Sequence, residues 1–239
     1  KINIDWEDTG TKKNYEDLII KYEKYNFNKD NQQIYISKSK VTKYFADKNI
    51  VNKIYNKGVL KKKIFPSNFI KKNNFISYDY IEGSTLYNYY NKNSLKLLLN
   101  FLENNLWNEK IKKSNSFKNI CRDFYFNKTI NRVRTFKKKY KYLDINNLNF
   151  KKKKILKIKD IFRKIDWNYI SDGTPKFIHG DLQFDNILFT NNKKFKLIDW
   201  RPNFGKSNII GDQYYDFAKL LGGLEINYDL IKKNKFSLR

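Results

Sequence analysis

The spacing of the apolar residues changes near residue 83, and this change constrains the fold more than any other feature of the chain. Before it, the stretches "QQIYIS" and "VTKYF" (32–37 and 41–45) alternate β-branched or aromatic residues with polar ones, as paired strands of a hairpin do. A helix over about 47–56 that ends at Gly58, and a strand within "NFISYDYIEG", should follow. The sequence therefore predicts a small unit of mixed α and β structure at the start of the chain.

After residue 83 the apolar residues recur at helical spacing. Ser94 is suited to cap a helix at its start. Leucines then recur every three or four positions: Leu95, Leu98, Leu99, Leu102 and Leu106. Two further helices are predicted over about 117–140 and 152–165. The second part of the chain should therefore be mainly helical, with a boundary to the first part near 82–84.

The chain is strongly basic, with 50 Lys and Arg against 24 Asp and Glu and a formal charge of +26. Such a charge usually favours binding to nucleic acid or to anionic membranes. Lysine is spread along the whole chain together with asparagine, isoleucine and tyrosine, so we interpret the charge as a drift in composition and expect no specific nucleic-acid partner. A basic nucleic-acid-binding module stays an alternative, and an anionic substrate such as a nucleotide would still benefit from the field.

Composition also limits the class of protein. A hydrophobic content of 40% and an aromatic content of 17% predict a folded chain, and no segment approaches the roughly 18–20 apolar residues of a membrane span. Cys121 is the one cysteine and His179 the one histidine, which excludes an internal disulfide and leaves zinc or thiol chemistry few groups. We expect a cytoplasmic protein. Because the chain begins at Lys1 and has no methionine, we also expect it to be part of a longer product.

The stretch "FIHGDLQFDNILF" groups polar residues directly before an apolar strand. Two short apolar segments, 187–190 and 195–198, flank a polar turn and predict a hairpin. If the turn is centred directly after Asn192, Asn186 lies opposite Asp199. Two oxygen-bearing side chains at one end of a hairpin suit a Mg2+ ion, which completes its coordination shell with water and substrate phosphates.

Asp181 precedes Asn186 by five residues, in the loop that enters this hairpin. A carboxylate there could accept the proton of a hydroxyl group that attacks a metal-bound phosphate. The order of Asp181, Asn186 and Asp199 therefore predicts a phosphoryl-transfer site. The alternative is structural, with Asp181 as a turn former, Asn186 as a strand cap and Asp199 as an exposed loop residue. His179 is expected to hold the loop rather than to react.

This stretch, followed by "FKLIDW", resembles the signature of the aminoglycoside phosphotransferase and choline kinase superfamily, whose members are relatives of the protein kinases. The resemblance implies an α+β, two-lobed, protein-kinase-like fold. It implies a helical segment or linker from a preceding domain over 1–30, a small β-rich N-lobe over 31–83, and a larger, mainly helical C-lobe with the catalytic loop and metal-binding hairpin over 84–239.

The resemblance also implies roles for individual residues, with ATP and Mg2+ as cofactors. Asp181 would be the catalytic base, and Asn186 and Asp199 would bind the metal. The residues implied at the nucleotide are Lys43, which resembles the strand lysine at the phosphates, and the hinge residues Tyr78, Tyr80 and Ile81. The residues assigned to the acceptor are Asp185, Arg201 and Tyr215, and those assigned to support of the site are His179 and Asp216. Asp185 has strand capping as its alternative role.

Two features depart from the family pattern. No glycine-rich loop precedes the first hairpin, and no glutamate lies between Lys43 and Glu82, so the usual partner of the lysine is missing or replaced, with Asp47 as the candidate. These departures motivate a second hypothesis, a pseudokinase or nucleotide-binding regulatory domain. The presence of Asp181, Asn186 and Asp199 argues for catalysis instead.

A finer resemblance is to kinases of bacterial capsular and surface-polysaccharide gene clusters, carried by "IDWEDTGTKKNYEDL", "FYFNKTINRVRTF" and "IDWRPNFG". It implies a nucleotidyltransferase domain fused before this chain. Arg201 stands where choline kinases tend to carry an acidic residue, which favours an acidic or phosphorylated acceptor; a salt bridge to Asp212 or Asp216 is the alternative. We predict an ATP- and Mg2+-dependent phosphotransferase that phosphorylates a hydroxyl group of a sugar, amino alcohol or choline-like molecule.

Overall fold

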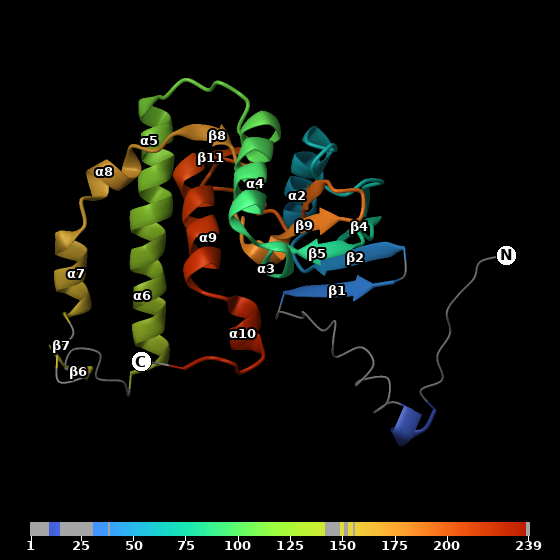
Figure 1. Ribbon diagram of the computed structural model, residues 1–239. Coiled ribbons are helices and arrows are strands. Elements are labelled where there is room, and N and C mark those ends of the chain that lie inside the picture. The colour runs from blue at the N-terminus through green and yellow to red at the C-terminus, as the bar shows by residue number, and fades with distance from the viewer. Residues whose placement is uncertain are drawn as a thin grey trace. The chain divides into compact units, whose positions relative to one another are not determined.

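The computed structural model describes residues 10–14, 31–37, 39–141, 149–150, 153–154 and 156–237. The chain forms two compact units, Lys1–Glu82 and Gly83–Arg239. A four-stranded sheet dominates the first, whereas the second is mainly helical with short strands, so the predicted α+β class is confirmed (Figure 1). The helical segment or linker implied over 1–30 lies outside the described residues except for 10–14. Within the described ranges, no helix is long and apolar enough to cross a bilayer.

The sheet of the first unit is antiparallel, with strand order β1-β2-β4-β3. Its strands are β1 (Gln32–Ile36), β2 (Lys40–Phe45), β3 (Ile70–Lys72) and β4 (Phe75–Asp79). The hairpin predicted from "QQIYIS" and "VTKYF" is confirmed, because β1 pairs with β2 from Gln32 opposite Phe45 onward. Buried and half-buried residues alternate along β2, which places Lys43 on the same buried face as Val41.

Helix α2 (Lys48–Leu60) packs against β3 and β4. It begins after Asp47, whose carboxylate accepts a hydrogen bond from the Asn49 N–H at 2.8 Å. The prediction that this helix ends at Gly58 is wrong. Gly58 is buried inside the last turn, and the C-cap is Lys61, whose N–H donates to the Gly58 carbonyl oxygen. Packing of the helix against the sheet outweighs the low helix propensity of glycine here.

The second unit contains the remaining elements (Figure 1). The helices are α3 (Leu86–Tyr89), α4 (Lys92–Asn105), α5 (Asn115–Arg122), the π-helix η1 (Asp123–Asn127), α6 (Lys128–Lys139), α7 (Ile158–Lys164), α8 (Trp167–Ser171), the 3-10 helix η2 (Phe184–Asn186), α9 (Gln213–Glu225) and α10 (Tyr228–Lys232). The strands are β5 (Gly83–Thr85), β6 (Asn149–Phe150), β7 (Lys153–Lys154), β8 (Pro175–Phe177), β9 (Ile187–Thr190), β10 (Phe195–Leu197) and β11 (Ile210–Asp212). They form a three-stranded sheet of order β10-β9-β5 and the pairs β11-β8 and β6-β7.

Helix α4 starts three residues earlier than the sequence predicts. Its N-cap is Asn91, and Ser94 occupies the third helical position of a capping box. The Asn91 side chain accepts the Ser94 N–H at 2.8 Å, and the Ser94 hydroxyl accepts the Asn91 N–H at 2.8 Å. The prediction of Ser94 as N-cap is therefore wrong, because both residues are capping types and the reciprocal pair favours the earlier start. The buried leucines of this helix are Leu98 and Leu102.

The long helix predicted over 117–140 is confirmed, with an interruption. Helices α5 and α6 form one continuous column that contains the π-turn η1 (Figure 1). This turn buries Phe124, whose ring stacks on Phe204 at a centroid distance of 4.0 Å. Tyr215 of α9 packs edge-on against Phe124 at 4.9 Å. The column is therefore joined to α9 by aromatic contacts at the π-turn.

The helix predicted over 152–165 is shorter in the structure. Helix α7 begins only at Ile158, and the lysines at 153–154 form the short strand β7, paired with β6. Lys153 and Lys154 offer no apolar side chain that could cover a helical face, which fits their place in a strand rather than a helix.

Candidate active site

The hairpin before the site has a different register from the predicted one. In β9 and β10, Ile187 pairs with Leu197 and Phe189 with Phe195, so Asn186 comes opposite Ile198 rather than Asp199. The Ile198 N–H donates to the Asn186 carbonyl oxygen at 2.9 Å. The predicted pairing of Asn186 with Asp199 is therefore wrong by one residue. Asp199 lies one position beyond the hairpin, at the same end as Asn186.

The loop at the tip of the hairpin explains this shift. Thr190 and Lys194 close a three-residue loop, in which the Thr190 N–H donates to the Lys194 carbonyl oxygen at 2.9 Å. Lys193, the last loop residue, has a left-handed backbone with φ 56°. A type I turn followed by a left-handed residue is a common three-residue hairpin loop, whereas the prediction assumed a loop with an even number of residues. One loop residue changes the pairing of every position that follows.

His179 links the Asp181 loop to the segment that carries Asp199. The imidazole is fully buried. Its Nε2 donates to the Ile198 carbonyl oxygen at 2.8 Å, and its Nδ1 accepts the Asp181 N–H at 3.2 Å, which requires the neutral Nε2–H tautomer. The His179 carbonyl oxygen accepts the Arg201 N–H at 2.9 Å. The hydrogen bonds to Ile198 and Arg201 hold the two backbone segments at a fixed separation, and the bond from Asp181 orders the loop itself.

Gly180, between His179 and Asp181, is required by the conformation of the loop. Its φ is +84°, and a Cβ at this position would lie 2.7 Å from the Arg201 Cβ. A residue with a side chain would therefore be strained and would also collide with the neighbouring segment.

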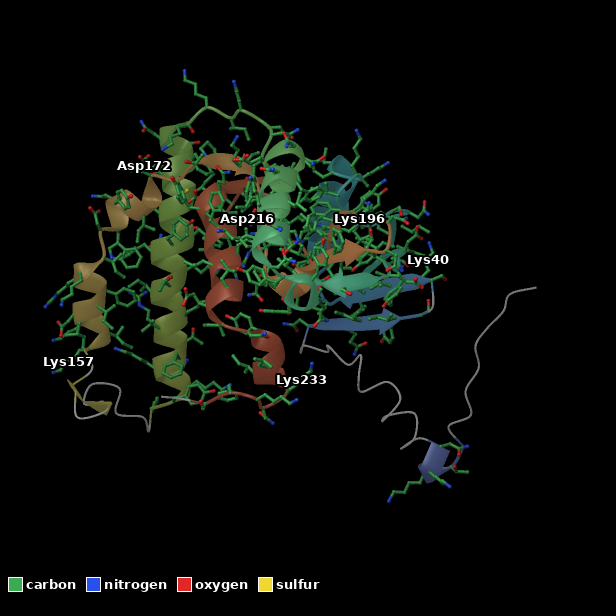
Figure 2. The ribbon with its side chains drawn as sticks, in the orientation of Figure 1. Lys40, Lys157, Asp172, Lys196, Asp216 and Lys233 are labelled. Atoms are coloured by element: carbon green, nitrogen blue, oxygen red, sulfur yellow. The ribbon has the colours of Figure 1, made fainter. Side chains whose placement is uncertain are left out.

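Asp216 holds the same loop from helix α9 (Figure 2). Its carboxylate is fully buried and accepts the N–H groups of His179 at 2.9 Å and of Gly180 at 2.7 Å. The indole Nε1–H of Trp107, directly after α4, donates to it at 3.2 Å. A buried carboxylate needs such donors to offset its desolvation. Asp216 therefore connects the loop, α4 and α9 through one side chain.

The side chain of Asn186 points its amide nitrogen toward the Asp181 loop. Its Nδ2 donates to the Asp181 carbonyl oxygen at 2.8 Å and lies 3.5 Å from Asp181 Oδ2. With the nitrogen committed to the loop, the amide oxygen Oδ1 is directed away from it. Asp185, in the same 3-10 turn, is half-buried, and its Oδ1 atom is inaccessible to solvent.

Asp199 is an exposed carboxylate on a strained backbone. Its φ is 58°, in the left-handed region, and the neighbouring Trp200 is buried. Aspartate adopts this conformation more readily than most residues, but at a cost. Asn186 and Asp199 thus offer one amide oxygen and one carboxylate, a donor set that fits Mg2+, which keeps several waters and phosphate oxygens. No group of three or more His, Cys, Asp or Glu side chains suited to a metal occurs among the residues that the structure describes.

Lys219 is a site residue that the sequence analysis missed. Its Nζ lies 2.9 Å from Asp181 Oδ1, and both side chains are partly exposed, at 27% and 38%. Lys219 follows Asp216 by three residues on α9, so both project from one face of the helix toward the loop. This spacing was visible in the sequence, but Lys219 is one of 50 basic residues and had no other distinguishing feature.

Arg201 and Tyr215 lie together beside the loop. The Arg201 Nη1 donates to the Tyr215 hydroxyl at 3.4 Å, and its Nε donates to the Asn203 carbonyl oxygen at 3.1 Å. Asp212 caps α9 and accepts the Tyr125 hydroxyl at 2.7 Å. Burial and the Asp212 charge raise the pKa of Tyr125 far above its ordinary value, so this phenol remains a hydrogen-bond donor.

The four residues predicted to bind the nucleotide all lie in the first unit. Lys43 and Tyr78 are buried in neighbouring strands, with Lys43 Nζ 5.7 Å from the centre of the Tyr78 ring. Burial raises the pKa of Tyr78 above its ordinary range. Tyr80 is exposed and its N–H donates to the Ser39 carbonyl oxygen at 2.9 Å, and Ile81 is half-buried. Because the Tyr78 ring packs inside the unit, only its main chain could meet an adenine.

Comparison with known proteins gives similarity of fold only. No protein-family model matches the chain, and no curated protein matches it. Solved structures similar to it include the gentamicin complex of APH(2")-IIa, the ADP-bound aminoglycoside phosphotransferase APH(2'')-Ib, and an ethanolamine kinase of Plasmodium vivax. Their sequence identities to the chain are 18%, 21% and 17%, and their TM-scores 0.48, 0.49 and 0.47.

These alignments extend over most of each molecule. They cover 91%, 85% and 95% of this chain and 75%, 73% and 71% of the three solved chains, in the same order. Because all the identities lie below 25% and all the scores below 0.5, the function has to be inferred from the residues of the chain itself.

Proposed function

We propose that the chain is a small-molecule kinase of protein-kinase-like fold, which transfers a phosphoryl group from ATP to a hydroxyl group. One observation carries the proposal. His179 and Asp216 fix the loop of Asp181, while Asn186 and the segment of Asp199 are tied to the same loop by hydrogen bonds. These three residues supply a carboxylate, an amide oxygen and a second carboxylate. Phosphoryl transfer needs such groups, one as a base and two as ligands of the metal.

The chemistry follows from the orientation of Asp181. Its Oδ1 contacts Lys219, and its Oδ2 is only weakly engaged, at 3.5 Å from the Asn186 amide nitrogen. Oδ2 can therefore accept the proton of an acceptor hydroxyl as its oxygen attacks the terminal phosphorus of the nucleotide. Asn186 and Asp199 would hold Mg2+, which neutralises charge on the phosphates when bound. Positioning and charge compensation supply the rate acceleration, since no covalent intermediate with the protein is needed.

The roles in the first unit are part of the same proposal. We assign Lys43 to the phosphates of the nucleotide and the main chain at Tyr78, Tyr80 and Ile81 to its base. The stretches that resemble capsular and surface-polysaccharide kinases support a cytoplasmic role in building such a glycan, behind a fused nucleotidyltransferase. The acceptor is then a sugar or amino alcohol.

The test is consumption of ATP with candidate acceptors. Purified protein with ATP and Mg2+ should convert ATP to ADP when a suitable sugar, sugar phosphate or amino alcohol is added, and mass spectrometry should detect the phosphorylated product. Asp181→Asn should slow this conversion by about 10²–10⁴-fold. If an acceptor is found and the Asp181→Asn variant still phosphorylates it at the original rate, the assignment of the base is wrong.

A pseudokinase is the second candidate, and one contact favours it. Lys219 lies against the carboxylate that would act as base, and a fixed ion pair there would compete with an acceptor hydroxyl. This candidate predicts nucleotide binding without turnover for every acceptor. A kinase in which the ion pair opens predicts the opposite result. The wild type should then turn over an acceptor, and Lys219→Gln should leave its rate unchanged or increase it.

A further inference from the structure

Cationic side chains gather around one pair of aromatic rings beside Asp181. Lys128 Nζ lies 3.9 Å from the centre of the Phe124 ring, and Arg201 Cζ lies 5.3 Å from the same centre. Lys219 Nζ lies 5.8 Å from the Tyr215 ring, which packs edge-on against Phe124. We call Lys128, Arg132, Arg201 and Lys219 the basic cluster.

Three separate elements build the basic cluster. Lys128 and Arg132 stand on α6, directly after the π-turn, Arg201 follows the hairpin, and Lys219 stands on α9. A π-turn inside an α-helix is rare and often marks a functional site. Here it brings Phe124 into the core and places Lys128 across the ring. The convergence is therefore a property of the tertiary structure and not of a local run of lysines.

The cluster carries excess positive charge. Burial, followed by the charges of Arg201, Arg132 and Lys219, lowers the pKa of Lys128 to about 8. Like charges placed together in this way oppose folding, and an anion bound among them would relieve the repulsion. Asp181 is the carboxylate that pairs with Lys219.

A groove continues from the cluster along α6. It has a volume of about 710 Å³, and its charged lining is mainly basic: Asp123, Lys128, Arg132, Lys139 and Lys206. Asp123 accepts a hydrogen bond from Asn127 at 3.0 Å, which compensates part of its charge within the lining. A ligand in this groove would meet ammonium and guanidinium groups, which are donors suited to phosphate and carboxylate oxygens.

Taking the proposed function as its basis, we infer that the acceptor is an anionic hydroxyl compound, such as a sugar phosphate, whose phosphate or carboxylate binds Lys128 and Arg201 while its hydroxyl faces Asp181. In the reaction the hydroxyl oxygen forms a bond to the terminal phosphorus of ATP, and the bond from that phosphorus to the bridging oxygen breaks. The hydroxyl proton passes to the Asp181 carboxylate, and ADP leaves with the bridging oxygen. A quaternary-amine acceptor would be repelled from the same place.

The anion in this cluster could belong to the acceptor or to the nucleotide, and titration calorimetry separates the two. Glycerol 3-phosphate and inorganic phosphate are titrated into the protein with and without saturating ADP and Mg2+, with glycerol and choline as matched uncharged and cationic probes. We expect both anions to bind in the presence of ADP, and the other two probes not to bind. Displacement of both anions by ADP would overturn the inference, because the cluster would then serve the nucleotide.

Variants link this binding to the cluster. Lys128→Gln and Arg201→Gln should each weaken anion binding by about tenfold or more, as expected for loss of a charge-assisted hydrogen bond. Lys128→Arg, which keeps the charge, should retain it. The matched controls are Arg134→Gln, two residues beyond Arg132 on the same helix, and Lys118→Gln, on α5; both side chains are exposed. The inference would be overturned if the control variants weakened anion binding equally. It would also be overturned if Lys128→Gln or Arg201→Gln left anion binding unchanged.

The outcome also separates this inference from the proposed function. Cluster-dependent anion binding without ATP turnover by any acceptor would contradict the kinase and leave the anion site in place. Turnover with glycerol or choline at least as fast as with glycerol 3-phosphate would support the kinase and contradict the anionic acceptor.

Discussion

The Asp216 carboxylate accepts the main-chain N–H groups of both His179 and Gly180, at 2.9 and 2.7 Å, from a fully buried position on α9. One side chain thereby sets the backbone of the loop that presents Asp181. The variant Asp216→Ala leaves these donors buried without an acceptor, so we expect it to lower the free energy of unfolding by about 3 kcal/mol or more. Urea unfolding measures this loss. Asp172→Asn is the matched control, because Asp172 forms an exposed ion pair at 3.5 Å and should change stability by less than about 1 kcal/mol.

Asp181→Asn should separate chemistry from folding. The ion pair of Asp181 with Lys219 is partly exposed, so its loss should cost less than about 1 kcal/mol of stability. If Asp181 is the base, kcat should fall by about 10²–10⁴ while the midpoint of urea unfolding hardly changes. Steady-state kinetics and urea unfolding on the same preparation give both values. A fall in activity that merely follows a loss of folded protein would contradict a chemical role.

Gly180→Ala and Gly222→Ala should act in opposite directions. At Gly180, φ is +84° and a Cβ would lie 2.7 Å from the Arg201 Cβ, so the variant should be less stable and its loop displaced. Gly222 lies within α9, and a Cβ there meets nothing within 4 Å, so alanine should stabilise the protein by about 0.5–1 kcal/mol. Thermal unfolding of the two variants tests this. Equal effects would show that the Gly180 loop adapts to a side chain.

Asp199 should show a conflict between stability and function. Its left-handed backbone, with φ 58°, suits glycine better, so Asp199→Gly should raise the free energy of unfolding by about 1 kcal/mol or less. The same variant removes a proposed metal ligand and should abolish the effect of Mg2+ on nucleotide affinity. Nucleotide titrations with and without Mg2+ compare it with the wild type. An undiminished Mg2+ effect would remove Asp199 from the metal site.

Anion binding to the basic cluster should weaken as the pH rises through about 8. Lys128 has a pKa lowered from 10.5 to about 8 in the folded protein, chiefly by burial and by Arg201, Arg132 and Lys219. Because the pKa is lower in the folded state, the charged lysine lowers the free energy of unfolding. This loss of stability is complete below pH 8, and it disappears as the pH rises from about 8 to 10.5. A bound anion favours the charged form of Lys128. Above pH 8 the Lys128 amine must therefore take up a proton when the anion binds, and this lowers the affinity for the anion.

Sulfate is the probe for this pH dependence, because its own charge stays constant in the range. Its affinity should fall between pH 7 and 9.5 in the wild type. Lys128→Arg should remove that fall, because the guanidinium stays protonated throughout. The other charged or titratable groups that face Lys128 or share its groove are Arg201, Arg132, Lys219, Asp123, Lys139, Lys206, Tyr140 and Tyr215. A pH profile unchanged by Lys128→Arg would assign the titration to a group other than Lys128.

Local patterns in the sequence were enough to predict the α+β class, the first hairpin and the two strands around the turn before Asp199. These features depend on residues close together in the chain, where alternation and helical spacing report directly on which face is buried. The same patterns placed element ends less well. Ser94 and Gly58 have the right chemistry for caps, yet a reciprocal bond with Asn91 and packing of α2 shifted both ends.

The available groups and their order are properties of the amino-acid sequence: Asp181, Asn186 five residues later, and Asp199 after a hairpin. How these groups are held depends on the fold. The register depended on the left-handed backbone of Lys193, and the loop on a carboxylate of α9. Lys219 and Lys128 became part of the site only because α9 and the π-turn pack on the same aromatic rings. Contacts between residues far apart in the chain leave no local pattern, and in a chain with 50 basic residues, charge alone could not identify these two.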